Sequence, residues 1–288
     1  MYSQIDANKR KTRILIAIFL SFVVGVGVFF NVYMDYGYSA VVIALVISLG
    51  MSWFSYYHGD KVALKSSRAK EIQKNDNPYV YRMVENLCIT AGMPMPKVHI
   101  IDSPALNAFA TGRDPEHASI ALTTGIINAL ENEELEGVIA HELSHIKNYD
   151  IRVMTIVIVL VGTIALMSDM FFRMSFFGGS SNRENKNPIF IVIGIALLIL
   201  SPIVAELIKL AVSRKREYLA DASGSLLTRY PEGLARALEK IAQSPAKLQT
   251  ASKATAHLFI SNPFKGKFAG AFSTHPPIQD RIAKLRGM

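Results

Sequence analysis

The sequence has a single cysteine, Cys88, and few charged residues. One cysteine cannot form an intramolecular disulfide or a cysteine-based metal cluster, so any metal chemistry must use histidines, carboxylates or hydroxyls. Charged residues make up 19% of the 288 residues and hydrophobic residues 50%, which is too apolar for a wholly soluble globule and excludes a disordered chain. Acidic residues are the scarcer charge, with 31 Lys and Arg against 23 Asp and Glu, a net charge of +8.

The apolar residues are concentrated in four long segments. Residues 14–33 and 36–57 carry no charge, and each can cross a hydrocarbon core of roughly 30 Å as a helix. A cleaved signal peptide is the alternative for the first, although no small-residue cleavage site follows its long apolar core. Residues 153–172 and 188–212 are less clean, because charged residues and a proline interrupt them, so a buried hairpin of a soluble core is their alternative. We predict four transmembrane helices in two hairpins.

Basic residues flank both predicted hairpins, and the positive-inside rule places these flanks in the cytoplasm. The first hairpin follows Lys9, Arg10, Lys11 and Arg13, and the second precedes Arg214, Lys215 and Arg216. The predicted organisation is a cytoplasmic N-terminus (1–13), a first hairpin (14–57), the first part of a cytoplasmic domain (58–150), a second hairpin (151–212) and the second part of that domain (213–288).

The polar blocks on either side of the second hairpin should fold together into one α+β domain. Periodicity and turn residues predict a helix over 79–92, short strands over 97–101, 107–111 and 119–124, and a helix over 131–147.

One motif in the last of these helices carries chemistry, the sequence HELSH at 141–145. The spacing of i and i+4 places His141 and His145 on one helix face, where both imidazoles can bind one zinc ion. Glu142 lies beside them, and its carboxylate can accept a proton from an attacking water and pass it to a leaving amine. The alternative to a zinc site is an ordinary surface helix on which the two histidines have hydrogen-bond partners and bind no metal.

A catalytic zinc takes three protein ligands, and the extended H-E-x-x-H-x-x-G-x-x-H motif is absent, so the third ligand must come from elsewhere. Glu217 is the best candidate, on a helix whose Ala220 and Gly224 permit close packing. Asp221, one turn further on, can accept a hydrogen bond from the outer nitrogen of a ligand histidine and fix its tautomer. Without HELSH upstream, a solvated charged helix face would be the simpler interpretation.

Four motifs in this order resemble the HtpX family of bacterial membrane zinc peptidases, gluzincins related to the CAAX prenyl endopeptidases. The motifs are NAFATG (107–112), HELSHIKNYD (141–150), REYLAD (216–221) and FSTHPP (272–277). The resemblance covers almost the whole chain. It implies one zinc ion per chain, bound by His141, His145 and Glu217, with Glu142 as general base and Asp221 hydrogen-bonded behind a ligand. It also implies a zincin-type catalytic domain facing the cytoplasm, in the bacterial cell (inner) membrane, and a role in quality control of membrane proteins.

Two further parts of a peptidase site can be assigned. Zincins pair an extended substrate with an exposed sheet edge, and backbone pairing reads few side chains. The predicted edge is formed by Asn107, Ala108, Phe109 and Ala110, with an ordinary strand that buries Phe109 as the alternative. His275 and Arg281 are candidates for stabilising the oxyanion that forms during peptide hydrolysis, whereas a surface cation near a helix is the alternative for Arg281.

The expected partners are membrane protein or unfolded polypeptide substrates and the lipid bilayer, while the oligomeric state stays open. Nucleic acid is not expected, because the basic charge lies at the membrane flanks and no aromatic-basic motif accompanies it. The main alternative function is a zinc-binding membrane scaffold or transporter without proteolytic activity. Glu142 argues against it, as does the placement of the candidate ligands outside the apolar segments.

Overall fold

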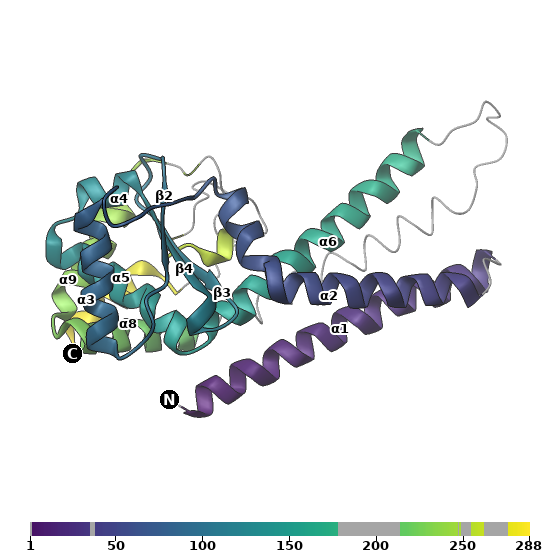
Figure 1. Cartoon of the computed structure of the whole chain (residues 1–288), viewed down its shortest axis with the longest axis horizontal. Helices are drawn as coiled ribbons and strands as arrows, with labels where there is room; N and C mark the ends of the chain where they lie inside the picture. Colours follow the sequence, from purple (N-terminus) through teal and green to yellow (C-terminus); the bar gives the residue numbers. More distant parts are fainter. Residues whose placement is uncertain (1, 35–37, 178–213, 247, 249–254, 262–275) are drawn as a thin grey trace.

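The computed structural model of the protein describes residues 2–34, 38–177, 214–246, 248, 255–261 and 276–288. A mixed α+β domain carries three long projecting helices (Figure 1), namely α1 (Tyr2–Met34), α2 (Tyr38–Ser66) and α6 (Asp150–Phe177). The predicted fourth membrane segment, residues 188–212, and the candidate His275 lie outside the described residues.

The sheet of the α+β domain has four strands in the order β1-β2-β4-β3. These are β1 (Lys70–Glu71), β2 (Lys97–Ile101), β4 (Ala118–Thr123) and β3 (Ala108–Gly112). β2 and β4 run parallel, and β1 and β3 lie antiparallel to their neighbours at the two edges. The predicted strands are confirmed to within one residue, whereas β1 was not predicted because two residues carry no readable alternation. β3 is an edge strand, in the position that substrate pairing requires.

Helices cover this sheet and enclose the core. They are α3 (Pro78–Ala91), α4 (Thr124–Ala129), α5 (Asn132–Lys147), α8 (Arg214–Thr228), α9 (Pro231–Gln243) and α10 (Ile278–Arg286), with 3₁₀ turns η1 (Pro115–His117) and η2 (Ala256–Leu258). Asn77 caps the start of α3, and Gly92 ends it in the left-handed conformation, as its position after the apolar repeat predicts. α5 begins with a capping box between Glu131 and Glu134. Its buried face packs into the largest apolar cluster of the described chain, against α3, the sheet and α9.

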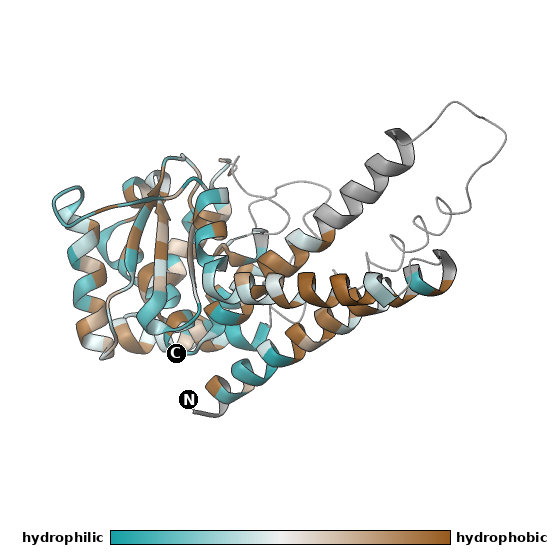
Figure 2. Ribbon diagram, turned by 45° about the vertical axis from the view of Figure 1, so that its right-hand side comes forward, coloured by the Kyte–Doolittle hydropathy of each residue, from teal (hydrophilic) through white to brown (hydrophobic). Residues whose placement is uncertain are grey.

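Of the projecting helices, α1 and α2 expose apolar side chains over much of their length. Among the described residues, one segment, Val41–Ser66 of α2, is long and apolar enough to cross a membrane by itself, and only 18% of it is buried. Hydrophobic colouring runs along the outer parts of α1 and α2, and the N-terminal part of α1 is hydrophilic (Figure 2). α1 begins at Tyr2 and runs without a break through the predicted boundary at residue 13, so the expected cytoplasmic flank is part of the same helix.

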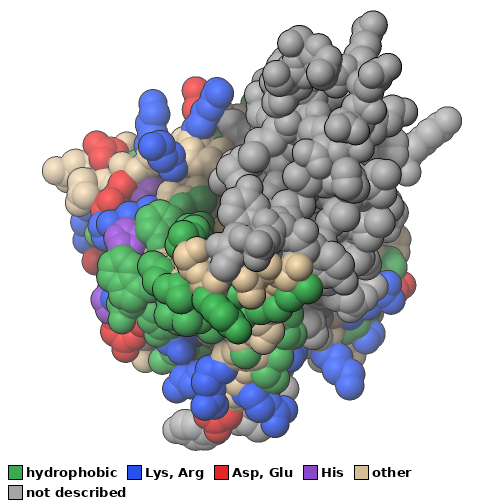
Figure 3. Space-filling view, turned by 90° about the vertical axis from the view of Figure 1, so that its right-hand side faces the viewer, with side chains coloured by type: hydrophobic (Ala, Val, Ile, Leu, Met, Phe, Trp, Pro, Cys, Tyr) green, Lys and Arg blue, Asp and Glu red, His purple; other side chains and the backbone are tan. Residues whose placement is uncertain are grey.

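Figure 3 looks onto the molecule from the side to which these helices project. Hydrophobic side chains gather in the middle of the described surface, and Lys and Arg side chains lie around its margin. At their inner ends the helices are tied together by apolar packing, in which Leu15, Phe19 and Val23 of α1 contact the Val153–Ile164 stretch of α6. A second cluster joins Leu64 of α2 and Met154 of α6 to Phe109 of β3, so the α+β domain meets the projecting helices through a packed junction.

Candidate metal centre

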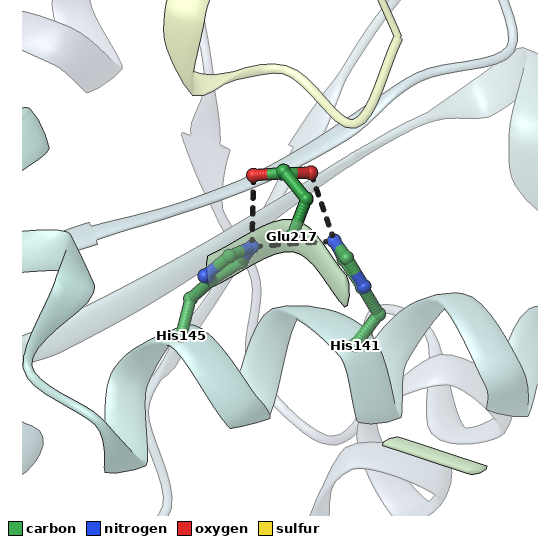
Figure 4. A group of neighbouring side chains, drawn as sticks. All are labelled: His141, His145 and Glu217. Carbon is green, nitrogen blue, oxygen red and sulfur yellow. Dashed lines mark hydrogen bonds and ion pairs between the residues drawn. The ribbon is translucent and has the colours of Figure 1, made fainter. Parts of the chain in front are cut away.

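Three buried donor atoms converge between α5 and α8. His141 and His145 lie one turn apart on α5, and Glu217 of α8 lies over both rings, with one carboxylate oxygen facing each ring (Figure 4). The Nε2 atoms of the two histidines are 3.2 Å apart, and the Glu217 oxygens lie 3.9 Å from His141 Nε2 and 3.7 Å from His145 Nε2. The three side chains that the sequence predicts as ligands thus form one cluster that could hold a metal ion.

The spacing of these donors suits zinc. Ligand atoms about 2.0–2.1 Å from a tetrahedral zinc lie about 3.4 Å from one another, close to the distances between the three donors here. Two imidazoles and one carboxylate form a donor set that zinc accepts and that leaves a fourth position open for water.

Close helix packing brings Glu217 to the histidines. A Cβ atom added at Gly224 would lie only 3.0 Å from the backbone nitrogen of His141, so α8 approaches α5 at the level of the ligands only because this residue has no side chain. Ala220, one turn earlier, is also fully buried. The small residues of REYLADASG therefore set the distance between the two helices that carry the ligands.

Each ligand histidine is held from behind by an aspartate. His141 Nδ1 lies 3.0 Å from Asp221 Oδ1, and His145 Nδ1 lies 3.0 Å from Asp150 Oδ2. A histidine that donates from Nδ1 to a carboxylate keeps the lone pair of Nε2 for a metal. The sequence predicts the Asp221 contact but gives no indication that Asp150 contacts a ligand.

The two histidines have different proton affinities. Burial lowers the pKa of His141 to about 4, and the charge of Arg281 acts in the same direction against the hydrogen bond to Asp221. Burial also acts to lower the pKa of His145, but the hydrogen bond to Asp150 and the carboxylate of Glu217 outweigh it and raise the pKa to about 9. The two imidazoles are chemically identical, so the difference between their pKa values comes from their surroundings.

Glu142 is buried beside the ligands, with 2% of its surface exposed. Burial raises its pKa to about 7, and the nearby Glu217 carboxylate adds to this rise. The charges of His145 and Arg281 and a hydrogen bond with the backbone of Ala110 act in the opposite direction. A carboxyl group with a pKa near 7 is suited to accept a proton and give it up again at neutral pH.

Arg281 lies beside two of the ligands, with Nη2 3.5 Å from His141 Nδ1 and Nη1 3.9 Å from Glu217 Oε2. Its Nε and Nη2 atoms donate to the two oxygens of Asp221 at 2.9 and 2.6 Å, and Nη1 donates to the Ile260 carbonyl at 3.2 Å. The side chain is fully buried, so the alternative of a surface cation is wrong. The two hydrogen bonds to Asp221 fix the carboxylate that holds His141, and the role of Arg281 in binding an oxyanion stays a prediction.

The edge strand β3 passes directly above Glu142. Its outward-facing groups have partners along most of the strand: Ile260 N–H donates to the Ala108 carbonyl at 3.0 Å, and Gly112 N–H donates to Thr155 Oγ1 at 3.1 Å. Between them, the Ala110 backbone contacts Glu142. Phe109 is fully buried and packs edge-on against Phe259, so its side chain belongs to the core. The backbone near Ala110 is therefore the part of the predicted substrate edge closest to the reacting groups.

Comparison with known proteins decides the family. A family model described as Peptidase family M48 matches residues 74–288. The chain belongs to this family. Curated relatives called "Protease HtpX homolog" are 46% identical in Tropheryma whipplei (strain Twist), covering 100% of this chain and 98% of that protein, and 42% identical in Streptococcus uberis, covering 100% of both. The relative of that description in Dictyoglomus thermophilum is 43% identical and covers 100% of this chain and 94% of that protein.

A solved structure has the same fold. The crystal structure of S. mikatae Ste24p matches with a TM-score of 0.51 and 17% sequence identity, over 99% of this chain and 67% of that chain. The resemblance to HtpX-type peptidases is confirmed, and this M48 peptidase is a metallopeptidase that hydrolyses peptide bonds. A scaffold or transporter without proteolytic activity is not favoured.

Proposed function

We propose that this M48 peptidase is an integral membrane endopeptidase with one zinc ion per chain, held by His141, His145 and Glu217. Its catalytic domain faces the cytoplasm of a bacterial cell, and four transmembrane helices in two hairpins anchor it in the inner membrane. Its substrates are misfolded or damaged membrane proteins and unfolded polypeptides, so that it serves quality control.

The observation that carries the zinc proposal is the convergence of three electron-rich atoms in a buried site. Both Nε2 atoms face each other at 3.2 Å and face the Glu217 carboxylate, while both Nδ1 atoms are directed to aspartates. Such a cluster needs positive charge among its donors, which a proton on His145 supplies in the metal-free protein and a zinc ion would supply when bound. Bound there, zinc would supply Lewis acidity that polarises water and the scissile carbonyl.

Glu142 is proposed as the general base. Its carboxylate takes the proton of the attacking water and delivers it to the nitrogen of the leaving amine, so one side chain serves both steps. The buried site excludes bulk water, which strengthens the interaction of this carboxylate with the developing charges. Asp221 and Asp150 hold the ligand rings in place, and Arg281 acts on the reaction through Asp221.

The backbone of β3 near Ala110 is proposed to align the substrate. Pairing of an extended peptide with this edge would place its scissile bond beside Glu142 and the ligands, because Ala110 contacts Glu142. His275 stays a prediction as an oxyanion-binding residue.

Membrane anchoring is supported by the exposed apolar surface of α1 and α2. Large exposed fractions belong to aliphatic side chains of their outer parts: Val32 (66%), Val46 (63%), Val42 (58%) and Ile43 (57%). A continuous apolar surface of this kind is costly in water and stable in hydrocarbon. The basic residues that precede the apolar part of α1 favour a cytoplasmic position for the catalytic domain.

The function is tested by measuring zinc content and casein cleavage of the purified protein and of Glu142→Gln. Wild type should contain one zinc per chain and cleave casein. The variant should keep its zinc and lose on the order of 10²–10⁴-fold in rate, because the proton acceptor is removed and the ligands are not. Glu133→Gln, an exposed position on the same helix, is the matched control. Undiminished cleavage by Glu142→Gln would contradict the mechanism.

Substrate preference needs a separate measurement in reconstituted membranes. A misfolded membrane protein and an unrelated unfolded soluble protein are offered together at equal concentration. We expect faster cleavage of the membrane protein, because Asp150, which contacts His145, is the first residue of the projecting helix α6. Equal rates would contradict a preference for membrane substrates.

A further inference from the structure

One contact of the metal centre comes from an unexpected part of the chain. Asn8 lies on α1, six residues before the apolar stretch, and only 1% of its surface is exposed. Its Nδ2 atom donates to Asp150 Oδ1 at 2.8 Å and to the Asn148 carbonyl at 2.9 Å. Its Oδ1 atom accepts from Arg216 Nη1 at 3.3 Å. The amide nitrogen of Asn8 therefore donates to two oxygen acceptors, and its carbonyl oxygen accepts from a guanidinium donor.

These partners are next to the ligands. Asp150 holds His145 Nδ1 through its other oxygen at 3.0 Å, so Asn8 and His145 share one carboxylate. Arg216 directly precedes Glu217 and lies 3.6 Å from Asp150 Oδ1. Asn8 thus bridges the end of α5 and the start of α8, the two segments that carry ligands. Both segments lie more than a hundred residues from Asn8 in the sequence.

The end of α5 needs such a support. Asn148 is the C-cap of α5, and Tyr149 adopts a left-handed conformation with φ of 59°, which is unfavourable for a residue with a bulky side chain. The bend turns Asp150 back toward His145. Asn8 satisfies the Asn148 carbonyl at this bend, and the Lys9 ammonium lies 5.1 Å from the centre of the Tyr149 ring. The N-terminal helix therefore holds the bend from outside.

Packing alone does not explain an asparagine here. Asn8 begins a buried stripe along one face of α1 that continues at helical spacing through Thr12, Leu15, Phe19 and Val23. The later members pack against α6, and an apolar residue at position 8 would continue that packing without the cost of burying an amide. The polar residue stands at the one end of the stripe that meets the metal centre. A buried polar group with all its partners fixes geometry more than it adds stability.

We propose that Asn8 is a positioning residue of the metal centre, which orients His145 through Asp150, so that the membrane-anchoring helix α1 is a working part of the site. This inference rests on the proposed zinc site. It predicts that removing the amide weakens zinc binding although Asn8 touches no ligand directly. Removal of a hydrogen-bond partner behind a metal ligand commonly costs 10–100-fold in metal affinity, and Asn8 lies one contact further out, so we expect a loss of about 10-fold.

The test is the zinc affinity of the full-length, metal-free protein in detergent micelles, measured by competition with a chromophoric chelator. Wild type is compared with Asn8→Ala, with Asn8→Leu, which keeps the branching of the side chain without its polar contacts, and with Asn86→Ala, the same substitution at an exposed helical position. Both Asn8 variants should bind zinc about 10-fold more weakly than wild type and Asn86→Ala. The electronic spectrum of the cobalt-substituted variants should shift, which a change in stability alone would not cause.

A double-variant cycle identifies the route. In Asp150→Ala the effect of Asn8→Ala on zinc affinity should vanish, because Asn8 acts through this carboxylate. An equal effect in both backgrounds overturns the route, and unchanged zinc affinity with an unchanged cobalt spectrum in both Asn8 variants overturns the inference. Glu217→Ala distinguishes failure of the proposed zinc site from failure of the inference about Asn8. If Glu217→Ala binds zinc as wild type does, both the site and the inference fail. If zinc affinity falls in Glu217→Ala but not in the Asn8 variants, only the role of Asn8 is contradicted.

Discussion

The two ligand histidines have the same inner contacts and different outer supports. Each Nε2 atom faces Glu217, and each Nδ1 atom lies 3.0 Å from an aspartate oxygen. Asp221, behind His141, is held by Arg281 of α10 inside the α+β domain. Asp150, behind His145, begins the projecting helix α6 and is held by Asn8 of α1. One half of the site thus belongs to the catalytic domain and the other half to its junction with the anchoring helices.

The two supports also differ in charge. Arg281 brings a fully buried cation to within 3.5 Å of His141 Nδ1, and its charge adds to the effect of burial in holding the pKa of His141 low. On the other side, the hydrogen bond to Asp150 raises the pKa of His145, and this carboxylate is held by the neutral amide of Asn8, with the Arg216 guanidinium 3.6 Å away. The comparison teaches that the two histidines of one H-E-x-x-H motif can be oriented differently, His141 through a close Asp221–Arg281 pair and His145 through an Asp150 carboxylate that Asn8 hydrogen-bonds.

The largest effect should come from the residue that joins both halves. Glu217→Ala removes the carboxylate that both rings face, so zinc affinity should fall by more than the 10–100-fold typical for an outer hydrogen-bond partner, and cleavage of casein should stop. Competition titration with a chelator measures the affinity. Glu133→Ala, at an exposed position of α5, is the control. Wild-type zinc affinity in Glu217→Ala would show that the two halves are not joined by a metal.

The next largest effect should be a difference in unfolding free energy between variants of the two aspartates that hold the histidines. Asp221→Ala removes the closest carboxylate of the buried Arg281 guanidinium and leaves Glu217 at 3.9 Å, so it should cost up to about 3–5 kcal/mol of unfolding free energy. Asp150→Ala should cost less, because Arg216 keeps its contact with Asn8. Thermal unfolding of the metal-free variants measures this difference. Adding Arg281→Met to Asp221→Ala should restore part of the stability, and failure to do so would argue against an uncompensated charge as the cause.

A smaller effect is expected where the two ligand helices touch. Gly224→Ala places a Cβ atom 3.0 Å from the His141 backbone nitrogen, so α8 must move by a few tenths of an ångström, at a cost of about 1–3 kcal/mol. Zinc affinity should fall together with stability, since Glu217 moves with α8. Gly287→Ala, where an added Cβ makes only ordinary contacts, should leave both unchanged. Wild-type behaviour of Gly224→Ala would mean that the helix spacing does not depend on this glycine.

The smallest effect concerns the rate at which Cys88 is alkylated, which reports whether a variant loosens the whole α+β domain. Cys88 is buried in the core of the α+β domain, and burial raises its pKa to about 11. At pH 8 its reactive thiolate should therefore be on the order of 100-fold rarer than that of an exposed cysteine, and alkylation should speed up about tenfold per pH unit. Asp221→Ala should accelerate iodoacetamide labelling at pH 8, whereas Asn8→Ala should not. Rapid labelling of the wild type would contradict the burial of this thiol.

Much of this architecture follows from local sequence patterns. The i, i+4 spacing of HELSH, the small residues around Glu217 and the turn residues between short strands have direct structural consequences, so the α+β domain and the clustering of His141, His145 and Glu217 could be predicted. Asp221 lies one turn from Glu217, so its reach toward a ligand is also a local property.

The contacts from distant segments could not be predicted in the same way. Asp150 points back to His145 only because Tyr149 takes a left-handed conformation, and an aromatic residue gives no signal for such a bend. Asn8 looks like part of a basic flank, and its burial depends on how α1 docks on α6. Arg281 meets Asp221 across 60 residues, so the sequence indicates a cation near the site but not which group it binds.

The central claim is that one metal ion lies among His141, His145 and Glu217. Diffraction from crystals of the zinc-loaded Glu142→Gln variant, recorded at the zinc absorption edge, tests it most directly. The account predicts a single anomalous peak per chain, about 2.0–2.2 Å from both Nε2 atoms and from a Glu217 oxygen. A peak elsewhere, or no peak between α5 and α8 in a preparation whose wild-type counterpart cleaves casein, would contradict it.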